Sequence, residues 1–266
     1  MIPKYIDIHS HLNDKQFDVD QKEVIDRTLK ESVWTIIVGT DKDMSQKACD
    51  ISATHDGLFA SIGVHPVDNI QEKFDMDFYR QLNKKNPKVV AIGECGLDYL
   101  HLSKDDSKEI RRQKERFESH IELAVELKKP LMIHCREAYS DLLDILEVKK
   151  REYGENLNAN IHFFAGDLGI AKKCLNLDFM LSFTGVITFA RDYDEVVKYS
   201  PLEKIMVETD APYVSPVPYR GKRCEPLYVS EIAKKVAMIR GEDETIVSGA
   251  LVENAMKFFS LYPLTF

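Results

Sequence analysis

The sequence predicts an α/β protein folded as a (β/α)8 barrel, the TIM-barrel architecture, in a single domain spanning residues 1–266. Strand-like runs alternate with helical segments, acids and imidazoles follow the ends of the runs, and 266 residues is a usual length for one such barrel. A doubly wound open sheet is the alternative, because alternation alone does not prove closure. No G-x-G-x-x-G follows the first run, which weakens a dinucleotide-binding version of that alternative.

The expected strands are short runs rich in β-branched or apolar residues, each followed by polar residues typical of turns. Several runs are continuously hydrophobic rather than alternating, as in parallel strands that are covered on both faces. The runs are Lys4–Ile8, Trp34–Val38, Phe59–Val64, Lys88–Ile92, Pro130–Ile133, Asn158–Phe163, Phe179–Phe183 and Lys204–Val207.

Segments with apolar residues at helical spacing separate and follow these runs. The clearest are Lys108–Lys128 and Glu137–Arg151, and Leu227–Ile239 and Asp243–Phe259 come after the last run. Eight strand–helix units in about this length are the pattern of the barrel.

Composition predicts a cytoplasmic protein without a membrane segment. The chain is 44% hydrophobic and 30% charged, and its net charge of −8 does not suggest a general nucleic-acid binder. An anionic substrate would therefore need a local basic or metal-lined site. The five cysteines are odd in number and form no C-x-x-C pair, which favours a reducing compartment. No signal peptide is expected before the first strand, and no protein partner is evident.

Two histidines end the first run, in the segment Tyr5–His11. Side chains alternate faces in an extended chain, so His9 and His11 are expected to point the same way. Neutral imidazole is a frequent metal ligand, so this pair could hold one cation from two directions. The alternative is a pair of polar residues in a loop.

Further acids and imidazoles follow later runs. Together with the first pair they are His9, His11, His65, Glu94, His134, His162 and Asp210. In a barrel the carboxyl ends of the strands converge on one mouth, where active sites of this fold lie. His55, His101 and His120 fall in helical or loop segments and are expected at the surface.

Each of these residues also has an ordinary interpretation. His134 or His162 alone could be a hydrogen-bonded core histidine, Glu94 a solvated loop acid, and Asp210 a turn former. Together these interpretations require independent coincidences at one end of one fold, so the sequence favours a shared site.

Four imidazoles and two carboxylates could hold two divalent cations. Glu94 could bridge a His9/His11 site and a His134/His162 site, because each carboxylate oxygen can coordinate a different metal. Asp210 could be both a ligand and the general base that accepts a proton from water. The donor set suits zinc, manganese, iron or nickel by affinity, and magnesium by abundance. Cys95 and Cys135 are expected to point away from the site.

Seven short motifs follow one another along the chain: Asp7–Leu12, Gly63–Pro66, Ile92–Tyr99, Gln113–Phe117, Pro130–Arg136, Glu208–Tyr213 and Asn254–Phe259. In this order they resemble the motifs of the TatD family of metal-dependent hydrolases and deoxyribonucleases, within the amidohydrolase-like barrels. The resemblance implies two divalent cations and metal-dependent phosphodiester hydrolysis. By position, the resemblance implies that His9, His11 and Asp210 bind one metal and that His134 and His162 bind the other. Glu94 would lie between the two metals.

Two segments depart from the family's pattern. The family commonly has H-C-F-S-G where His162–Gly166 reads His-Phe-Phe-Ala-Gly, and its R-G-x-x-N-x-P appears as Arg220–Pro226, with Cys224 in place of asparagine. Both departures concern substrate contacts more than metal binding.

A polyanionic substrate needs cations near the metals. Arg136, two residues beyond His134, could clamp a phosphate bidentately. The loop Tyr219–Arg223 is basic through Arg220 and Arg223, although it could equally be a solvated loop with incidental charge. The remaining candidate substrate contacts are His65, Asp98, Tyr213 and Tyr219. The two tyrosines could stack on unpaired bases. His65 could instead simply pack in its loop.

Two functions remain in view. The first is an exonuclease-like deoxyribonuclease that acts on single-stranded DNA or strand ends through a two-metal centre with Mg, Mn, Zn or Ni. The alternative is a hydrolase of a small amide, lactone or phosphoester with the same centre. Local arginines favour the first function, and the overall acidity mildly favours the second. A barrel with vestigial metals is disfavoured, because every candidate ligand is present.

Overall fold

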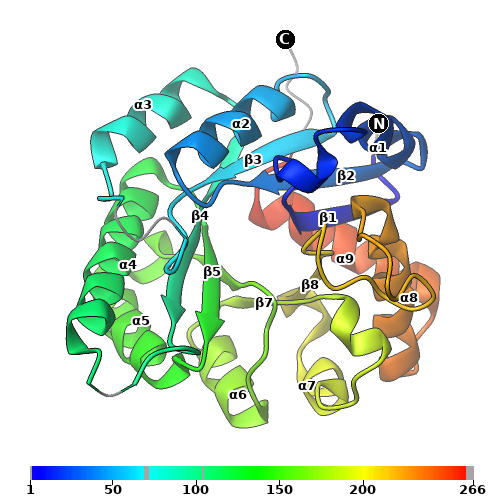
Figure 1. Ribbon diagram of the computed structural model, residues 1–266. Helices are drawn as coiled ribbons and strands as arrows, with labels where there is room; N and C mark the ends of the chain where they lie inside the picture. The colour runs from blue at the N-terminus through cyan, green and yellow to red at the C-terminus, as the bar shows by residue number, and fades with distance from the viewer. Residues whose placement is uncertain (1, 69–71, 104, 262–266) are drawn as a thin grey trace.

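The computed structural model describes residues 2–68, 72–103 and 105–261, and the ends of the expected domain, residues 1 and 262–266, lie outside these ranges. Eight parallel strands follow one another in sheet order β1 to β8, and a bridge between Ser10 and Ala211 joins the first edge to the segment after the last strand (Figure 1). The predicted barrel is therefore confirmed. The strands are β1 (Tyr5–Ser10), β2 (Val33–Val38), β3 (Leu58–Ile62), β4 (Val89–Asp98), β5 (Leu131–Arg136), β6 (Ala159–Ile161), β7 (Met180–Phe183) and β8 (Ile205–Val207).

Helices surround the strands. They are α1 (Gln21–Lys30), α2 (Lys42–Ser52), α3 (Met76–Lys85), α4 (Ser107–Leu127), α5 (Tyr139–Tyr153), α6 (Leu168–Asn176), α7 (Asp194–Tyr199), α8 (Val229–Arg240) and α9 (Glu244–Phe258). Aspartates mark several starts: Asp41, Asp75, Asp167 and Asp243 each accept a hydrogen bond from a backbone N–H of the first turn. None of the helices in the described part of the chain is both long and apolar enough to cross a membrane.

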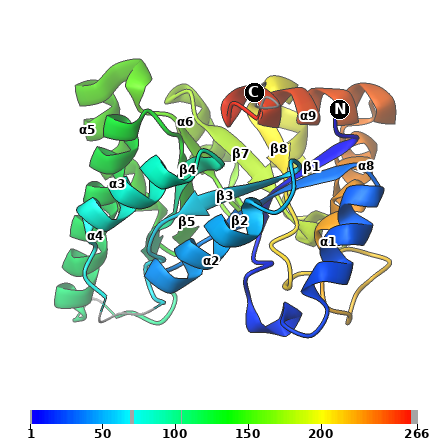
Figure 2. The same cartoon turned by 90° about the horizontal axis from the view of Figure 1, so that it is seen from above.

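Two hydrophobic clusters hold the barrel together. The larger one fills the space between the strands and the surrounding helices. The smaller one contains Ile6, Ile36, Met132 and other strand residues together with Ala255 of α9. Helix α9 packs against β1 and β8 and lies beside the start of β1 in Figure 2. The end of the barrel opposite the polar residues is therefore covered with apolar side chains.

Strand β4 is longer than the run Lys88–Ile92 predicted. It continues to Asp98, so Glu94 lies within the strand. The segment contains Gly93 and Gly96, which are unfavourable in ordinary strands. Here glycine is required, because a Cβ at Gly96 would lie 2.0 Å from the carbonyl oxygen of His134 on β5, and its φ is +140°. Close approach of β4 and β5 brings Glu94 toward His134 on β5.

The expectation that His120 lies at the surface is wrong. It is fully buried on α4, where its Nδ1 bonds the carbonyl of Arg116 at 2.7 Å and its Nε2 accepts the backbone N–H of Val64 at 3.0 Å. The reason is that helix α4 packs against the segment that leads from β3 to His65, and this imidazole satisfies an N–H there. His55 and His101 are exposed, as expected.

Candidate metal centre

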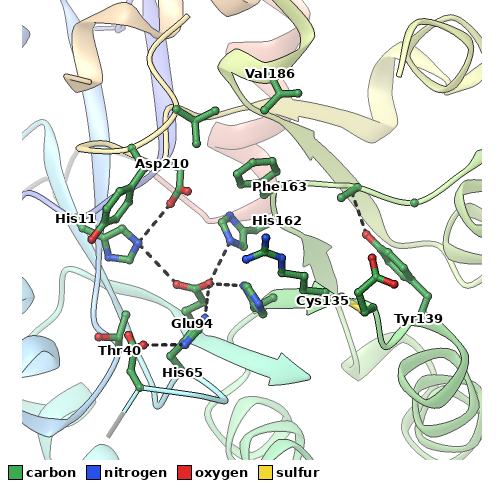
Figure 3. Close-up of a pocket in the computed structure, with 18 of the residues that line it drawn as sticks. His11, Thr40, His65, Glu94, Cys135, Tyr139, His162, Phe163, Val186 and Asp210 are labelled. Atoms are coloured by element: carbon green, nitrogen blue, oxygen red, sulfur yellow. Dashed lines mark hydrogen bonds and ion pairs between the residues drawn. The ribbon is translucent and has the colours of Figure 1, made fainter. Parts of the chain in front are cut away.

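The candidate ligands converge on one pocket of about 930 Å³ at the carboxyl ends of the strands (Figure 3). Of the residues singled out in the sequence, the pocket is lined by His11, His65, Glu94, His134, Arg136, His162, Asp210 and Tyr213. His9 lies beneath this surface, fully buried, with its ring stacked on that of His162 at 3.7 Å between centroids. The loops after β1, β3 and β8 supply His11, His65 and Asp210, while β4 and β5 supply Glu94 and His134 directly.

Four side chains gather their donor atoms beside β1. The Nε2 atoms of His9 and His11 lie 3.1 Å apart. Oε2 of Glu94 lies 3.4 Å from the first and 3.7 Å from the second. Oδ1 of Asp210 lies 3.7 Å and 3.4 Å from the same two nitrogens. Atoms that ligate one cation tetrahedrally at 2.0–2.2 Å are about 3.3–3.6 Å apart. The spacing of these donors therefore fits a divalent cation.

A second group surrounds the other oxygen of Glu94. Its Oε1 lies 3.0 Å from Nδ1 of His134 and 3.1 Å from Nε2 of His162. Nε2 of His65 lies 3.5 Å from the same oxygen, and the other nitrogen of His65 faces Asp68 at 3.3 Å. The two oxygens of one buried carboxylate thus face different histidines, as a bridging ligand requires, and imidazoles converge from β5 and the end of β6.

The carboxylates of the centre are held in their charged form. Burial by itself would raise the pKa of Glu94, but the nearby His65 and His162 bring this pKa well below its ordinary value. Burial likewise opposes ionisation of Asp210, yet its hydrogen bond with His11 and the proximity of the other histidines lower its pKa. Both groups are therefore anionic at neutral pH, which is the state in which a carboxylate binds a metal.

His9 is held in its neutral form. Burial and the neighbouring His162 lower its pKa. Neutral imidazole is the form that donates a lone pair to a metal. The charge state of this buried histidine therefore also suits ligation.

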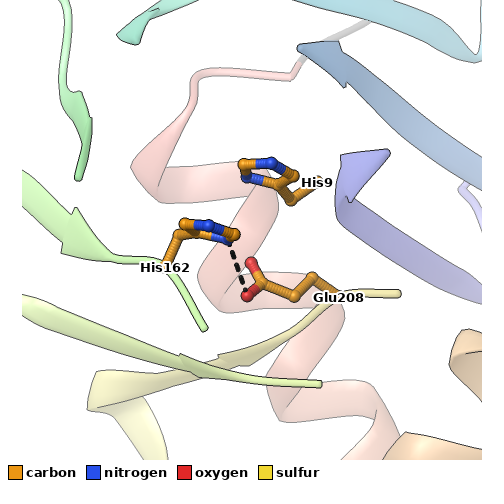
Figure 4. A group of neighbouring side chains, drawn as sticks. All are labelled: His9, His162 and Glu208. Carbon is orange, nitrogen blue, oxygen red and sulfur yellow. Dashed lines mark hydrogen bonds and ion pairs between the residues drawn. The ribbon is translucent and has the colours of Figure 1, made fainter. Parts of the chain in front are cut away.

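Two buried carboxylates contact the ring nitrogens of His134 and His162 that face away from Glu94. Oδ2 of Asp98 lies 2.9 Å from Nε2 of His134. Oε1 of Glu208 lies 3.1 Å from Nδ1 of His162, and a dashed line marks this contact in Figure 4. The sequence suggested Asp98 as a substrate contact, whereas the structure places it against a candidate ligand. Sequence reasoning missed Glu208 as a site residue, and the available signal was its position two residues before Asp210.

Some of the candidate substrate contacts line the pocket, and others are bound elsewhere. Arg136 is exposed and lines the pocket, and among the described residues none forms an ion pair with its guanidinium. Tyr213 also lines the pocket, 46% exposed, with its ring near that of His11. Tyr219 instead stacks on Tyr228 at 3.9 Å.

The structure does not bring the two loop arginines to the pocket. Arg220 lies over the ring of Phe189 at 3.9 Å and donates to the carbonyl of Ser215. Both terminal nitrogens of Arg223 bind Asp20, at 2.8 Å and 2.6 Å. These contacts attach the loop after β8 to neighbouring loops and to the segment before α1.

Cys95 is fully buried in the cluster between strands and helices, away from the pocket as expected. Cys135 belongs to the same cluster but also lines the pocket, beside Tyr139 on its α5 side (Figure 3). None of the candidate metal groups in the described ranges includes a cysteine.

Comparison with known proteins gives a consistent result over nearly the whole chain. A family model described as TatD related DNase matches residues 6–260. YabD of Bacillus subtilis, named an uncharacterized metal-dependent hydrolase, is 39% identical over 259 residues, which is 96% of this chain and 98% of that protein. A protein of Mycobacterium tuberculosis named an uncharacterized metal-dependent hydrolase TatD is 31% identical over 264 residues, covering 96% and 98% of the two chains.

Solved structures agree with this sequence similarity. The TatD homologue YJJV of Escherichia coli superposes with a TM-score of 0.86 at 26% identity, covering 98% of this chain and 99% of that one. A TatD family hydrolase of Entamoeba histolytica shares the fold, with a TM-score of 0.84 at 24% identity and coverage of 98% and 100%.

Proposed function

The chain belongs to the TatD-related DNase family, and from that premise we propose that it is a divalent-metal-dependent hydrolase acting on phosphodiester bonds of DNA. The proposed substrates are single-stranded DNA and strand ends, since a recessed mouth admits a free terminus more readily than the middle of a duplex. The observation that carries the proposal is Glu94, whose two carboxylate oxygens face separate groups of histidines.

The proposed centre takes two cations. His9, His11 and Asp210 would hold one, His134 and His162 the other, and Glu94 would contribute one oxygen to each. When bound there, divalent cations neutralise charge on a phosphate and acidify water. The mixed nitrogen and oxygen donors suit zinc, manganese or nickel, and magnesium at cellular abundance.

The chain's own residues supply the remaining steps of the proposed reaction. Asp210 is anionic, lies at the pocket surface and can accept the proton that the attacking water loses. Arg136 presents to the pocket a guanidinium that no described residue pairs with, and it can bind a non-bridging phosphate oxygen. His65 lines the pocket beside Glu94 and is a further candidate for a contact with the same phosphate.

One observation favours a second candidate, hydrolysis of a small amide, lactone or phosphoester. Besides Arg136 and the candidate ligands Glu94 and Asp210, the pocket lining contains four further acids: Asp14, Asp68, Glu137 and Asp167. Acidic walls repel a long polyanion, while a small uncharged substrate would be unaffected. The same metal ligands and the same Asp210 would serve this reaction.

A paired assay decides between the two. Metal-loaded protein is incubated with end-labelled single-stranded DNA and, in parallel, with a panel of small esters, amides and lactones. Asp210→Asn should lower turnover of the true substrate at least about 100-fold. Asp56→Asn, a matched change in an exposed turn, should leave it unchanged. DNA cleavage that persists in Asp210→Asn would rule out this mechanism, and turnover confined to the small-molecule panel would replace the DNA proposal with the second candidate.

A further inference from the structure

Glu208 is a fully buried carboxylate immediately after β8. It accepts hydrogen bonds from Nδ1 of His162 at 3.1 Å, from the hydroxyl of Ser182 at 2.9 Å and from the backbone N–H of Phe163. A buried charge is costly unless hydrogen bonds satisfy it. These donors come from β7 and from the end of β6, so Glu208 ties three neighbouring segments together at the base of the pocket.

The orientation of Glu208 is itself constrained. Asn160 on β6 donates to the hydroxyl oxygen of Ser182 at 2.8 Å, which leaves the hydrogen of that hydroxyl for Glu208. On the other side, Phe163 has a φ of +45°, a conformation that a bulky residue adopts only when its surroundings hold it there. The hydrogen bond from its N–H to Glu208 is one such restraint.

Glu208, as the acceptor at Nδ1, determines which ring nitrogen of His162 carries the hydrogen. Without it, neutral His162 would place the hydrogen on Nε2, which lies 3.1 Å from Oε1 of Glu94. That tautomer would point an N–H, rather than a lone pair, toward the position of the second cation. With Glu208 accepting from Nδ1–H, Nε2 is the nitrogen left to ligate a cation between His162 and Glu94.

The same relation occurs at His134 and is lacking at His9. Asp98 binds the ring nitrogen of His134 that faces away from Glu94. By contrast, Nδ1 of His9 is buried and has no hydrogen-bond partner among the described residues. Buried carboxylates therefore accept from the outer ring nitrogens of His134 and His162, whereas no described residue does so for His9.

We propose that Glu208 is a positioning residue that fixes the tautomer and ring orientation of His162 and thereby sets the affinity of the second cation site. This inference rests on the proposed two-cation centre, and it assigns Glu208 no contact with substrate. Carboxylates that orient a ligating histidine typically change metal affinity about 10–100-fold when they are removed.

The test titrates apo protein with Zn²⁺ or Mn²⁺ in competition with a chromogenic chelator. Glu208→Gln keeps the shape but removes the charge, and it should weaken one binding event about 10–100-fold while leaving the other unchanged. Asp98→Asn should weaken the same event. The matched control is Glu225→Gln, a buried glutamate that pairs with Arg27 away from the pocket, and it should alter neither affinity.

A double-variant comparison separates positioning from general stabilisation. In a His162→Ala background, Glu208→Gln should change metal affinity less than about 2-fold, because the histidine through which it acts is absent. The visible spectrum of the Co²⁺-loaded protein should also shift in Glu208→Gln and not in Glu225→Gln. If Glu208→Gln fails to fold by circular dichroism, Glu208→Asp replaces it, since its shorter side chain keeps the charge but loses the contact.

Two results would overturn the inference: wild-type affinities in a folded Glu208 variant, or an equal loss with and without His162. The titration uses no substrate, so its outcome is independent of the DNA assay. A protein that shows the expected affinity changes but does not cleave DNA would retain the inference and lose the proposed nuclease function.

Discussion

The Nε2 atoms of His9, in the buried end of β1, and of His11, in the loop that follows, face each other across 3.1 Å. Two neutral imidazole lone pairs at this distance repel, so a proton or a cation between them is required for the arrangement to be favourable. Asp210 and Glu94 add carboxylate oxygens to the same point. We therefore expect divalent cations to contribute to the stability of the folded protein, beyond any role in catalysis.

Metal removal should lower thermal stability. A cation that binds only the folded state adds about 2.7 kcal/mol at 100 times its dissociation constant. Melting curves with chelator and with added Mn²⁺ or Zn²⁺ should show the metal-loaded protein melting several degrees higher. His9→Ala should lose much of this increase, while His55→Ala, an exposed histidine, should keep all of it. An equal increase in both variants would exclude His9 as a ligand.

Glu94→Gln should reduce the binding of both cations, because each of its oxygens faces a different group of histidines. The amide keeps one neutral oxygen and replaces the other with an NH2 group, which cannot ligate. Metal content after gel filtration should fall from about two equivalents in the wild type to below one. Retention of two equivalents in Glu94→Gln would mean that the carboxylate does not bridge.

Arg136→Ala should raise KM for single-stranded DNA about 10-fold with a smaller effect on kcat, because its guanidinium lines the pocket and pairs with no acid in the described part of the chain. The salt dependence of DNA binding should weaken by about one phosphate contact. Steady-state kinetics at several salt concentrations measure both effects.

Arg223→Ala provides the comparison. This arginine binds Asp20 outside the pocket, so its removal should lower stability and leave KM unchanged. The reverse pattern, with KM dependent on Arg223 and not on Arg136, would reinstate the loop after β8 as the substrate contact.

The sequence was sufficient for the barrel and for the convergence of the candidate ligands. The carboxyl ends of parallel strands meet at one mouth of a barrel. Residues that follow the strand runs, such as His9, Glu94 and Asp210, are therefore predicted to meet there even when the packing of the barrel is unknown. The limits of β4 were less predictable, because Gly93 and Gly96 resemble turn residues until their contact with β5 is known.

Contacts between distant segments could not be predicted from local patterns. Asp20 and Arg223 are 203 positions apart, and nothing near either residue indicates that the basic loop is bound to protein rather than free for substrate. His120 likewise meets Val64 from 56 positions away. Glu208 is 46 positions from His162, and its role depends on how β6 and β8 are placed around β7.

His120 should make stability depend on pH. Burial lowers its pKa from 6.5 to about 3. Between these values the unfolded chain binds a proton at this residue and the folded chain does not, so stability falls as the pH falls through this window, by up to about 1.4 kcal/mol per pH unit. Urea unfolding at several pH values should therefore show a smaller loss of stability on acidification in His120→Gln than in the wild type. The exposed His55→Gln should keep the wild-type dependence, and identical curves for His120→Gln would contradict the prediction.

Gly96→Ala should destabilise the barrel and disturb the metal centre together. A Cβ at this position would lie 2.0 Å from the carbonyl oxygen of His134, and a φ of +140° is unfavourable for alanine. Strain and overpacking of this kind should cost about 3 kcal/mol or more in urea unfolding. Since Gly96 pairs with His134 across the β4–β5 ladder, relief of the clash should also move His134 away from Glu94 and weaken metal binding.

Gly249→Ala is the matched control for this substitution. Gly249 lies on the exposed side of α9, with nothing within 4 Å of an added Cβ. Alanine is favoured over glycine within a helix, so this variant should gain about 0.5–1 kcal/mol and keep wild-type metal affinity. If Gly96→Ala were as stable as Gly249→Ala, the close approach of β4 and β5 would not be what fixes the distance between Glu94 and His134.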